Sequence, residues 1–285
     1  MKKSSYPAEV YLNDQWFKPE EAVVSVFDRA FMFGDGIYEV TPFYRGKPFR
    51  LQDHLDRLKY CLSEIKISFD IAILETLMFE ALSRSGLTQK DAAVYIQISR
   101  GVAPRTHYFP EDAKPNFLMY AFPVQLEKFQ DKRWRVVISE DFRYQRCDIK
   151  STSLLANTMS NEDAISTGFD ENLLVRDGLF TEGSHSTAFF VANGTVYTHP
   201  EGPLILSGIT RKVVLELCKD LNINFKEEAF PLGRISEVNE VFLTGTTTQI
   251  TLVESLHFKG KEIFRSQKGQ IAGRLQEEFL RRTRG

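Results

Sequence analysis

The stretch "LLVRDGLFTEGSHSTAFFVANGTVYTH", residues 173–199, contains two dipeptides that are typical of tight β-hairpin turns. Asp177-Gly178 and Asn193-Gly194 each lie between short apolar runs rich in β-branched and aromatic residues. Asp-Gly and Asn-Gly readily adopt the positive φ angles that a two-residue hairpin turn requires. We therefore expect two successive hairpins, and hence a domain with a largely antiparallel sheet.

The rest of this half of the chain alternates strand and helix patterns. Hydrophobic spacing and turn residues predict four further elements. They are a strand at 134–139, a helix at about 154–166, a helix at 206–221 that starts at a Ser207-Gly208 cap, and two strands joined by a hydroxyl-rich turn within 240–253.

The first half of the chain also mixes helices and strands. In "RLQDHLDRLKYCLSEIKI", residues 50–67, leucine and isoleucine recur every three or four positions, which predicts a helix with one apolar stripe. A second helix is expected at 71–86, ending at Gly86, and strands at 92–101 and 116–122. A polar stretch follows. We therefore expect an N-terminal α/β domain at 1–123, a linker at 124–132 and a C-terminal domain at 133–285.

Composition restricts the class of protein. The chain has 285 residues, of which 42% are hydrophobic and 26% charged, with a net charge of −2. These values are typical of a globular protein of about two domains and argue against a nucleic-acid or membrane partner. No signal peptide or spanning segment is apparent, so we expect a cytoplasmic protein. Three widely spaced cysteines without a C-x-x-C pair argue against disulfides and a metal site.

Lys150, in "CDIKSTSLL" at 147–155, is a candidate for covalent chemistry. It lies between the segment "RCDI", which we expect to be extended, and the helix expected at about 154–166. A lysine held at such a junction can form a Schiff base when its amine is neutral. A lysine that simply extends into solvent explains the local sequence equally well.

Two segments are candidate anion sites. The helix start at 207–210 offers backbone N–H groups and the positive end of a helix dipole, and "TGTTT", residues 244–248, offers hydroxyls on a flexible turn. An ordinary capped helix and an ordinary polar turn remain alternatives. The chain contains neither a G-x-x-x-x-G-K-[ST] nor a G-x-G-x-x-G motif.

Other polar residues have two interpretations each. Arg105 and His107 point the same way if their loop is extended, which would suit a carboxylate, or they belong to a solvent-exposed loop. Glu182 is either an exposed strand-end residue or the partner of a cationic ring nitrogen. His54, with Asp53 and Asp56, lacks metal-ligand spacing, and we expect it on the polar side of its helix.

Seven segments, in this order, resemble the landmarks of the class IV, fold-type IV, pyridoxal-phosphate aminotransferases, and most of all the bacterial D-amino acid aminotransferases. The resemblance implies an α+β fold with two α/β domains, largely antiparallel sheets and an active site at the domain interface. The segments are "FDRAFMFGDGIYEV" (27–40), "HLDRL" (54–58), "SRGVAPRTHYFP" (99–110), "RCDIKS" (146–151), "TEGS" (181–184), "LSGITR" (206–211) and "FLTGTTTQIT" (242–251).

The resemblance implies pyridoxal 5′-phosphate (PLP) as cofactor, bound mainly by the C-terminal domain. Lys150 matches the Schiff-base lysine that also transfers protons, and Glu182 matches the carboxylate on the pyridine nitrogen. The remaining cofactor positions match an arginine and a cup around the phosphate together with an apolar residue on the ring: Arg57, Ile209, Thr210, Thr246 and Leu206.

The resemblance also implies a substrate site and an assembly. Tyr38, Arg105 and His107 match the carboxylate trap of the D-family, and Val40 and Thr247 match pocket-lining positions. In that family the arginine and histidine come from the neighbouring subunit, so a homodimer is expected. The implied activity is a ping-pong exchange of the amino group between D-amino acids and 2-oxo acids. The alternatives are other class IV enzymes: a branched-chain L-aminotransferase, an (R)-amine transaminase or an aminodeoxychorismate lyase.

Three departures from the family pattern lie at positions expected to affect the substrate pocket. Gly245 replaces the serine usual in D-enzymes, and "HST" at 185–187 replaces a Ser-Ser-Asn run. Pro42 lies in a strand that enters the active site in the family, and we expect that strand to be an edge strand or to be broken there.

Overall fold

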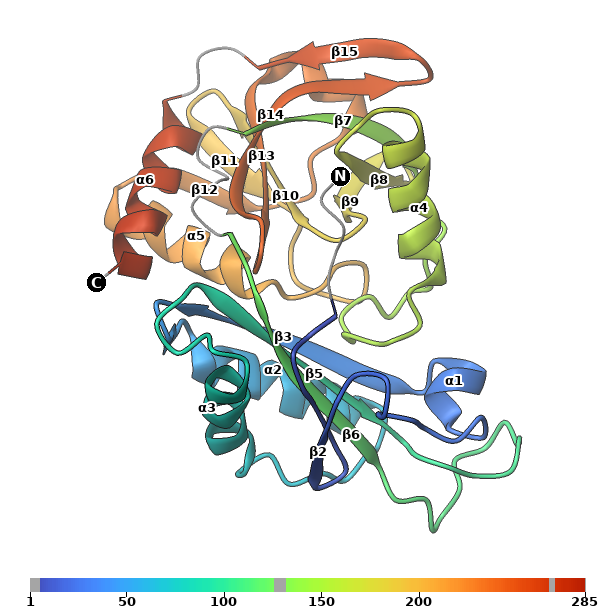
Figure 1. Cartoon of the computed structure of the whole chain (residues 1–285). Coiled ribbons are helices and arrows are strands. Elements are labelled where there is room, and N and C mark those ends of the chain that lie inside the picture. The colour runs from blue at the N-terminus through green and yellow to red at the C-terminus, as the bar shows by residue number, and fades with distance from the viewer. Residues whose placement is uncertain (1–5, 126–131, 267–269, 285) are drawn as a thin grey trace. The chain divides into compact units, whose positions relative to one another are not determined.

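The computed structural model describes residues 6–125, 132–266 and 270–284. The described residues form two compact units, which are treated separately below (Figure 1). The first contains residues 6–125 and 149–154, and the second contains the described residues of 132–148 and 155–284. Most of the linker predicted at 124–132 lies outside the described residues.

The first unit is built on a six-stranded sheet in which all neighbouring strands are antiparallel. The strand order is β2-β1-β6-β5-β3-β4, and a short helix, α1 (Arg29–Phe33), precedes β3. The strands are β1 (Val10–Leu12), β2 (Gln15–Phe17), β3 (Gly36–Tyr44), β4 (Lys47–Pro48), β5 (Ala92–Ser99) and β6 (Asn116–Pro123).

Two helices cover one face of this sheet. Helix α2 (Leu51–Glu64) packs on β3, and α3 (Leu74–Arg84) packs on β5 and β6. Both helices confirm the sequence prediction, because the apolar stripe of α2, including Leu58 and Leu62, is buried in the core. Gly86, with φ 63°, follows the end of α3 as expected of a glycine at a helix C-terminus.

Strand β3 runs through Pro42 without a break. Pro42 is paired with Ala93 of β5, and its carbonyl accepts a hydrogen bond of 3.0 Å from the Phe49 N–H. The proline nitrogen therefore also faces the β4 side, where β4 pairs only with Phe43 and Tyr44. The strand tolerates the proline because no ladder partner requires an N–H at this position.

Residues 149–154 belong to the first unit, although the predicted boundary at 133 places them in the C-terminal domain. Ser151 forms an isolated β-bridge with Ile37, and the Lys150 carbonyl accepts a 2.9 Å hydrogen bond from the Tyr38 N–H. Ile149 is buried in the core of the first unit. Hydrogen bonds to β3 thus fix the segment that carries Lys150.

The second unit is built on a nine-stranded sheet in the order β12-β11-β10-β13-β14-β7-β8-β9, with β15 on β14. Three of its strand pairs are parallel, β7 with β8, β7 with β14 and β11 with β12, and the others are antiparallel. The strands are β7 (Arg133–Glu140), β8 (Glu171–Arg176), β9 (Leu179–Gly183), β10 (Thr187–Ala192), β11 (Thr195–Thr198), β12 (Asn224–Glu227), β13 (Val238–Gly245), β14 (Gln249–Phe258) and β15 (Lys261–Arg265).

Both predicted hairpins are confirmed. Asp177 and Gly178 have φ angles of 52° and 76°, and Asn193 and Gly194 have φ angles of 50° and 72°. These positive values at both central positions are those of a two-residue turn that matches the strand twist. The second hairpin brings Phe190 of β10 into the core of the unit.

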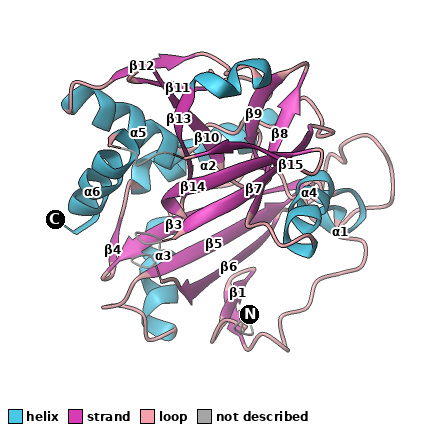
Figure 2. Ribbon diagram, turned by 90° about the horizontal axis from the view of Figure 1, so that it is seen from above, coloured by secondary structure: helices cyan, strands magenta, loops and turns pink. Residues whose placement is uncertain are grey.

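Three helices and a 3-10 helix complete the second unit (Figure 2). Helix α4 (Leu155–Ser166) packs on β7 and β8, whereas α5 (Ile209–Asp220) and α6 (Ile271–Arg284) pack on each other and on β13. The 3-10 helix is Leu232–Glu237. The segment "RCDI" before Lys150 is not extended as expected but contains a turn at Cys147-Asp148.

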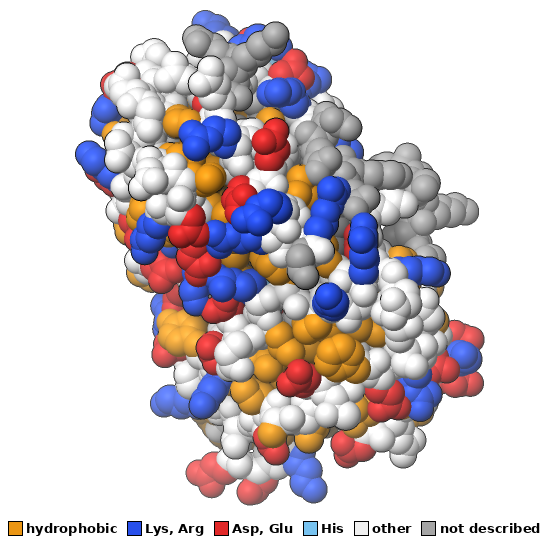
Figure 3. Space-filling view, turned by 90° about the vertical axis from the view of Figure 1, so that its left-hand side faces the viewer, with side chains coloured by type: hydrophobic (Ala, Val, Ile, Leu, Met, Phe, Trp, Pro, Cys, Tyr) orange, Lys and Arg blue, Asp and Glu red, His pale blue; other side chains and the backbone are white. Residues whose placement is uncertain are grey.

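The surface carries charges of both signs. Lys, Arg, Asp and Glu side chains are interspersed on the face shown in Figure 3, with apolar side chains gathered in places between them. Across residues 6–125, 132–266 and 270–284, the helices are too short or too polar to cross a membrane. The same residues contain no cluster of three or more His, Cys, Asp or Glu side chains that could hold a metal ion.

Candidate functional site

Lys150 is held by its backbone and lies against an aromatic ring. Its N–H donates to Cys61 Sγ at 3.3 Å, and its carbonyl accepts from the N–H of Tyr38. The Nζ atom lies 4.1 Å from the centroid of the Tyr38 ring, and the residue is partly buried. The amine therefore lies at the face of β3 that carries Tyr38, rather than extending freely into solvent.

The opposite face of β3 carries a buried charged cluster that the sequence analysis missed. Glu39 accepts two hydrogen bonds from Arg57, from Nε at 2.9 Å and from Nη2 at 2.6 Å, and its Oε1 lies 2.9 Å from His54 Nδ1. Burial raises the pKa of Glu39, but the charge of Arg57 and the contact with His54 outweigh it, so that this pKa is lowered overall. Glu39 thus orients the guanidinium of Arg57 as an anion.

The expectation that His54 lies on the polar side of its helix is wrong. His54 is buried together with Arg57, one helical turn further along α2. Burial lowers the pKa of His54 because it disfavours the charged imidazole. The spacing of His54 and Arg57, together with an acidic residue in a neighbouring strand, was the available signal.

Tyr38 and Val40 are both partly buried and lie on the face of β3 opposite to Glu39. Tyr38 stacks on Tyr95 of β5 with ring centroids 5.7 Å apart, and Tyr95 stacks on Tyr120 of β6 at 5.1 Å. Burial raises the pKa of Tyr95, so its hydroxyl stays protonated. The structure therefore extends the predicted pocket residues into a row of three tyrosines, of which Tyr95 and Tyr120 were not foreseen.

Arg105 and His107 come together on one aromatic ring, that of Phe33. Arg105 Cζ lies 5.1 Å from the centroid of this ring, and the His107 ring lies 5.8 Å from it. The loop between them is fixed by Arg29, whose Nη1 donates to the carbonyl of Thr106 at 2.8 Å. Both side chains are exposed. The guanidinium and the imidazole are therefore placed beside the same ring, as a receptor for a carboxylate requires.

Glu182, at the end of β9 in the second unit, is buried and ion-paired. Its Oε1 accepts from Arg143 Nη1, and its Oε2 accepts from the Leu206 N–H at 3.1 Å. Arg143 also forms a two-point ion pair with Asp141. Burial raises the pKa of Glu182, and the shared Arg143 only partly opposes this effect. Glu182 is thus a buried carboxylate rather than an exposed strand-end residue.

Helix α5 begins at Gly208, and no side chain caps its N-terminus. Ser207, which was part of the expected cap, instead donates its hydroxyl to Glu201 Oε1 at 2.7 Å. A Cβ atom on Gly208 would lie 2.8 Å from Thr187 Oγ1, so that only glycine fits here. The first N–H groups of the helix, at Ile209 and Thr210, are therefore positioned to bind an anion.

The turn between β13 and β14 also fits an anion. The hydroxyls of Thr244 and Thr248 are buried and have no hydrogen-bond partner among the described residues. Buried hydroxyls are ordinarily hydrogen-bonded, so these two indicate a missing acceptor or donor. A Cβ on Gly245 would lie 2.6 Å from Thr248 Oγ1, so the Thr248 hydroxyl occupies the space of a side chain at 245. Thr246 and Thr247 are partly buried in the same turn.

Comparison with known proteins identifies the family. The model of the amino-transferase class IV family matches residues 36–256. The chain is 38% identical over 251 residues to a D-alanine aminotransferase from Bacillus licheniformis, covering 87% of this chain and 88% of that protein. It is 36% identical over 277 residues to a D-alanine aminotransferase from Staphylococcus aureus (strain N315), covering 95% and 96%.

Solved structures show the same fold. A branched-chain amino acid aminotransferase from T.th., complexed with N-(5′-phosphopyridoxyl)-L-glutamate, superimposes with a TM-score of 0.86 at 24% identity and covers 98% of this chain and 95% of its own. The branched-chain aminotransferase of Thermoproteus uzoniensis gives a TM-score of 0.84 at 23% identity, with coverage of 98% and 95%.

The chain belongs to the class IV aminotransferase family. It is therefore a fold-type IV transaminase that works with PLP, as the seven sequence segments predicted. The described residues suit this cofactor, because an uncapped helix start and two unpartnered threonine hydroxyls match a phosphate group. A buried carboxylate, Glu182, matches a protonated ring nitrogen.

Proposed function

We propose that this protein exchanges the amino group between D-amino acids and 2-oxo acids, with pyruvate and 2-oxoglutarate as acceptors, by a ping-pong mechanism. The observation that carries the proposal is the placement of Arg105 and His107 on the Phe33 ring, where both can bind one carboxylate. Relatives named D-alanine aminotransferase, at up to 38% identity, support this choice of substrate.

The proposed cofactor residues divide by the part of PLP that they hold. Arg57, oriented by Glu39, and the N–H groups of Ile209 and Thr210 bind the phosphate, together with Thr246. Glu182 holds the ring nitrogen, and Leu206 packs on the ring. Bound PLP supplies an electron sink for negative charge that develops on the substrate α-carbon.

Lys150 is the proposed catalytic residue. Its Nζ holds the cofactor covalently in the resting enzyme and, once displaced by substrate, moves the proton from the substrate α-carbon. The hydrogen bonds of the Lys150 backbone to Tyr38 and Cys61 fix the start of the side chain. The amine therefore returns to one position in each half of the ping-pong cycle.

The proposed substrate trap decides which enantiomer reacts. Arg105 binds the α-carboxylate through two N–H groups, with His107 and Tyr38 as further donors, while Val40 and Thr247 line the pocket. A carboxylate fixed at two points leaves only one face of the α-carbon towards Lys150. The placement of the trap thus favours one hand of amino acid.

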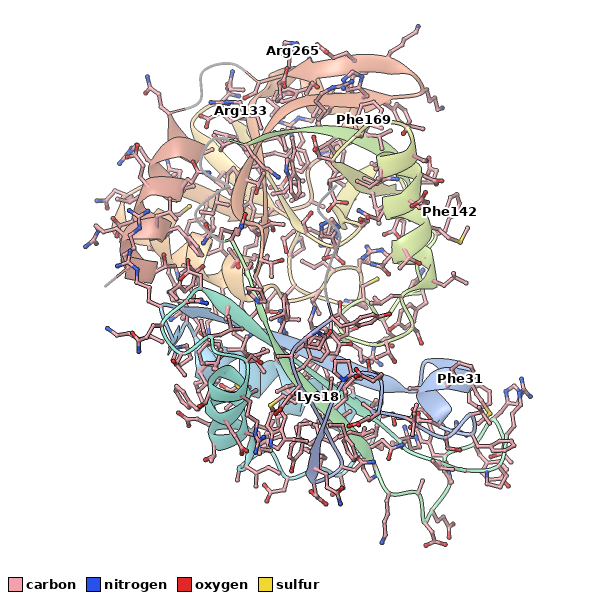
Figure 4. All side chains as sticks on the ribbon, viewed as in Figure 1. Lys18, Phe31, Arg133, Phe142, Phe169 and Arg265 are labelled. Carbon is pink, nitrogen blue, oxygen red and sulfur yellow. The ribbon has the colours of Figure 1, made fainter. Side chains whose placement is uncertain are left out.

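We also propose a homodimer in which the partner subunit contributes its copy of the Arg105 and His107 loop. Support comes from apolar side chains that remain exposed in this part of the first unit, including Phe31, which is 74% exposed and labelled in Figure 4. Exposed apolar patches of this kind mark protein interfaces. The set comprises Val23, Val24, Val26, Phe27, Phe31, Val102, Tyr108 and Phe109.

A single-turnover experiment with paired enantiomers tests the proposal. Addition of D-alanine or D-glutamate to the PLP-loaded protein should bleach the cofactor absorbance, and the L-enantiomers should not. Borohydride reduction beforehand should fix the cofactor to Lys150, as peptide mass spectrometry would show. Bleaching by L-amino acids alone would refute the proposal in favour of a branched-chain enzyme.

Arg105→Ala separates amino acid substrates from simple amines. The variant should raise KM for D-alanine by roughly 10- to 100-fold, because a charge-assisted contact is lost, and should leave turnover of primary amines little changed. Arg133→Ala, at an exposed position of β7, is the matched control (Figure 4). An unchanged KM for D-alanine in Arg105→Ala would contradict the assigned trap.

A further inference from the structure

His185 forms an ion pair with a fully buried carboxylate. Its Nδ1 lies 3.0 Å from Glu171 Oε2, and the Glu171 side chain is 0% exposed whereas that of His185 is 49% exposed. A buried carboxylate requires a nearby positive charge or several hydrogen bonds. Contact with Glu171 therefore favours a proton on Nδ1, and the exposed part of the imidazole can act as a donor towards solvent.

Glu171 is held in place by several donors. Its Oε1 accepts from the N–H groups of Asn172 and Ser184 at 2.8 and 3.2 Å, and from the Ser184 hydroxyl. Its Oε2 accepts from the Ser186 hydroxyl at 2.8 Å. Burial raises the pKa of Glu171, but the contacts with His185 and the serine hydroxyls outweigh burial and lower this pKa overall, so the carboxylate is ionised. His185 therefore rests on a fixed negative charge.

The position of His185 relates it to the proposed cofactor site. His185 lies three residues after Glu182, in the connection that leads into β10. Its carbonyl oxygen is 3.8 Å from the place of a Cβ on Gly245, so this connection runs beside the turn that carries Thr246 and Thr247. At Gly245 no side chain projects from the turn towards His185.

We propose that His185 determines specificity for acidic substrates by binding the second carboxylate of a D-dicarboxylic amino acid or of its 2-oxo acid. The inference rests on the proposed function, which assigns the α-carboxylate to Tyr38, Arg105 and His107. The group left for His185 is the one at the end of the substrate side chain. An imidazole supported by a buried carboxylate is an anion receptor of the required charge.

His185→Ser tests this inference, because serine removes the imidazole while its small hydroxyl fits the same connection. We expect kcat/KM for D-glutamate and for 2-oxoglutarate to fall by roughly 10- to 100-fold, with D-alanine and pyruvate changed less than about threefold. Calorimetry with the PLP-loaded protein should show the same loss for glutarate, a dicarboxylate that cannot react, and no loss for butyrate.

His257→Ser is the matched control, since His257 also lies beside a carboxylate, with Nε2 at 3.7 Å from Glu262, but on the β14–β15 hairpin. This control should keep the wild-type ratio of D-glutamate to D-alanine turnover. An unchanged ratio in His185→Ser, with D-alanine still transaminated, would overturn the role of His185 alone. If the wild-type protein transaminates no D-amino acid, the proposed function itself fails.

Discussion

Two buried arginine–glutamate pairs, one in each unit, show how the same two side chains acquire opposite properties. In the first unit Glu39 is bound by Arg57 and His54, and its pKa is lowered. In the second unit Glu182 is bound by Arg143, and its pKa is raised. Both carboxylates are buried, so burial alone does not explain the difference.

The difference lies in how the two guanidinium groups are shared between carboxylates. Arg57 donates to Glu39 through both Nε and Nη2. Arg143 gives Nε and Nη2 to Asp141 and Nη1 to Glu182. Asp141 also raises the pKa of Glu182 by its own negative charge. Glu39 is thus a fixed anion that orients Arg57, whereas Glu182 has a proton affinity that a cationic ring can satisfy.

The largest expected effect comes from removing either arginine. Arg57→Met removes the guanidinium that neutralises Glu39, and Arg143→Met removes a guanidinium that two buried carboxylates, Glu182 and Asp141, share. Loss of one partner of a buried ion pair costs about 3–5 kcal/mol, and we expect the Arg143 variant to lose more. The midpoint of urea unfolding, followed by circular dichroism, measures this difference.

Arg281→Met is the control for these variants, because Arg281 pairs with Glu278 at the surface of α6 and should give an unchanged midpoint. The double variant Arg57→Met/Glu39→Gln should recover part of the loss, since the carboxylate that Arg57 neutralised is then absent. Equal midpoints for Arg57→Met and Arg143→Met would contradict the distinction between the two pairs.

The next effect separates the two glutamates in catalysis. Glu182→Gln should lower kcat for D-alanine by about 10²–10³-fold, because a neutral amide no longer keeps the cofactor nitrogen protonated. Glu39→Gln should lower kcat far less and should chiefly weaken PLP binding, since Glu39 acts by orienting Arg57. Steady-state kinetics at saturating PLP, with PLP affinity from fluorescence titration, separate these results. A larger kcat loss in Glu39→Gln would reverse the assignment.

Local sequence signals predicted most of the secondary structure and the candidate residues. The hairpins at Asp177-Gly178 and Asn193-Gly194 and the leucine stripe of α2 are decided within about ten residues, so their patterns suffice. The lysine at 150 and the glutamate at 182 were reached by motif resemblance. Their side-chain roles are still proposals.

The partners of these residues could not be predicted, because they depend on contacts between distant segments. Glu39 and Arg57 are 18 positions apart, and Arg143 and Glu182 are 39 apart. No local pattern marks such pairs, since a charged residue usually indicates an exposed position. The error about His54 has the same cause, because its buried partner lies on another element.

The smallest effect is a difference in pH dependence between the two pairs in the cofactor-free protein. The pKa of Glu39 lies below its ordinary value of 4.5, so its contribution to stability is present above pH 4.5 and is lost as the pH falls. The pKa of Glu182 lies above 4.5, so its contribution is present below pH 4.5 and is lost as the pH rises through the folded-state value.

Melting temperatures between pH 4 and pH 8 test these opposite signs. The advantage of the wild type over Glu39→Gln should shrink towards pH 4, whereas its advantage over Glu182→Gln should shrink towards pH 8. Glu277→Gln, at an exposed position of α6, is the control and should give a flat difference across this range. Parallel pH profiles for Glu39→Gln and Glu182→Gln would show that the two carboxylates have the same proton affinity, and that sharing Arg143 with Asp141 does not distinguish them.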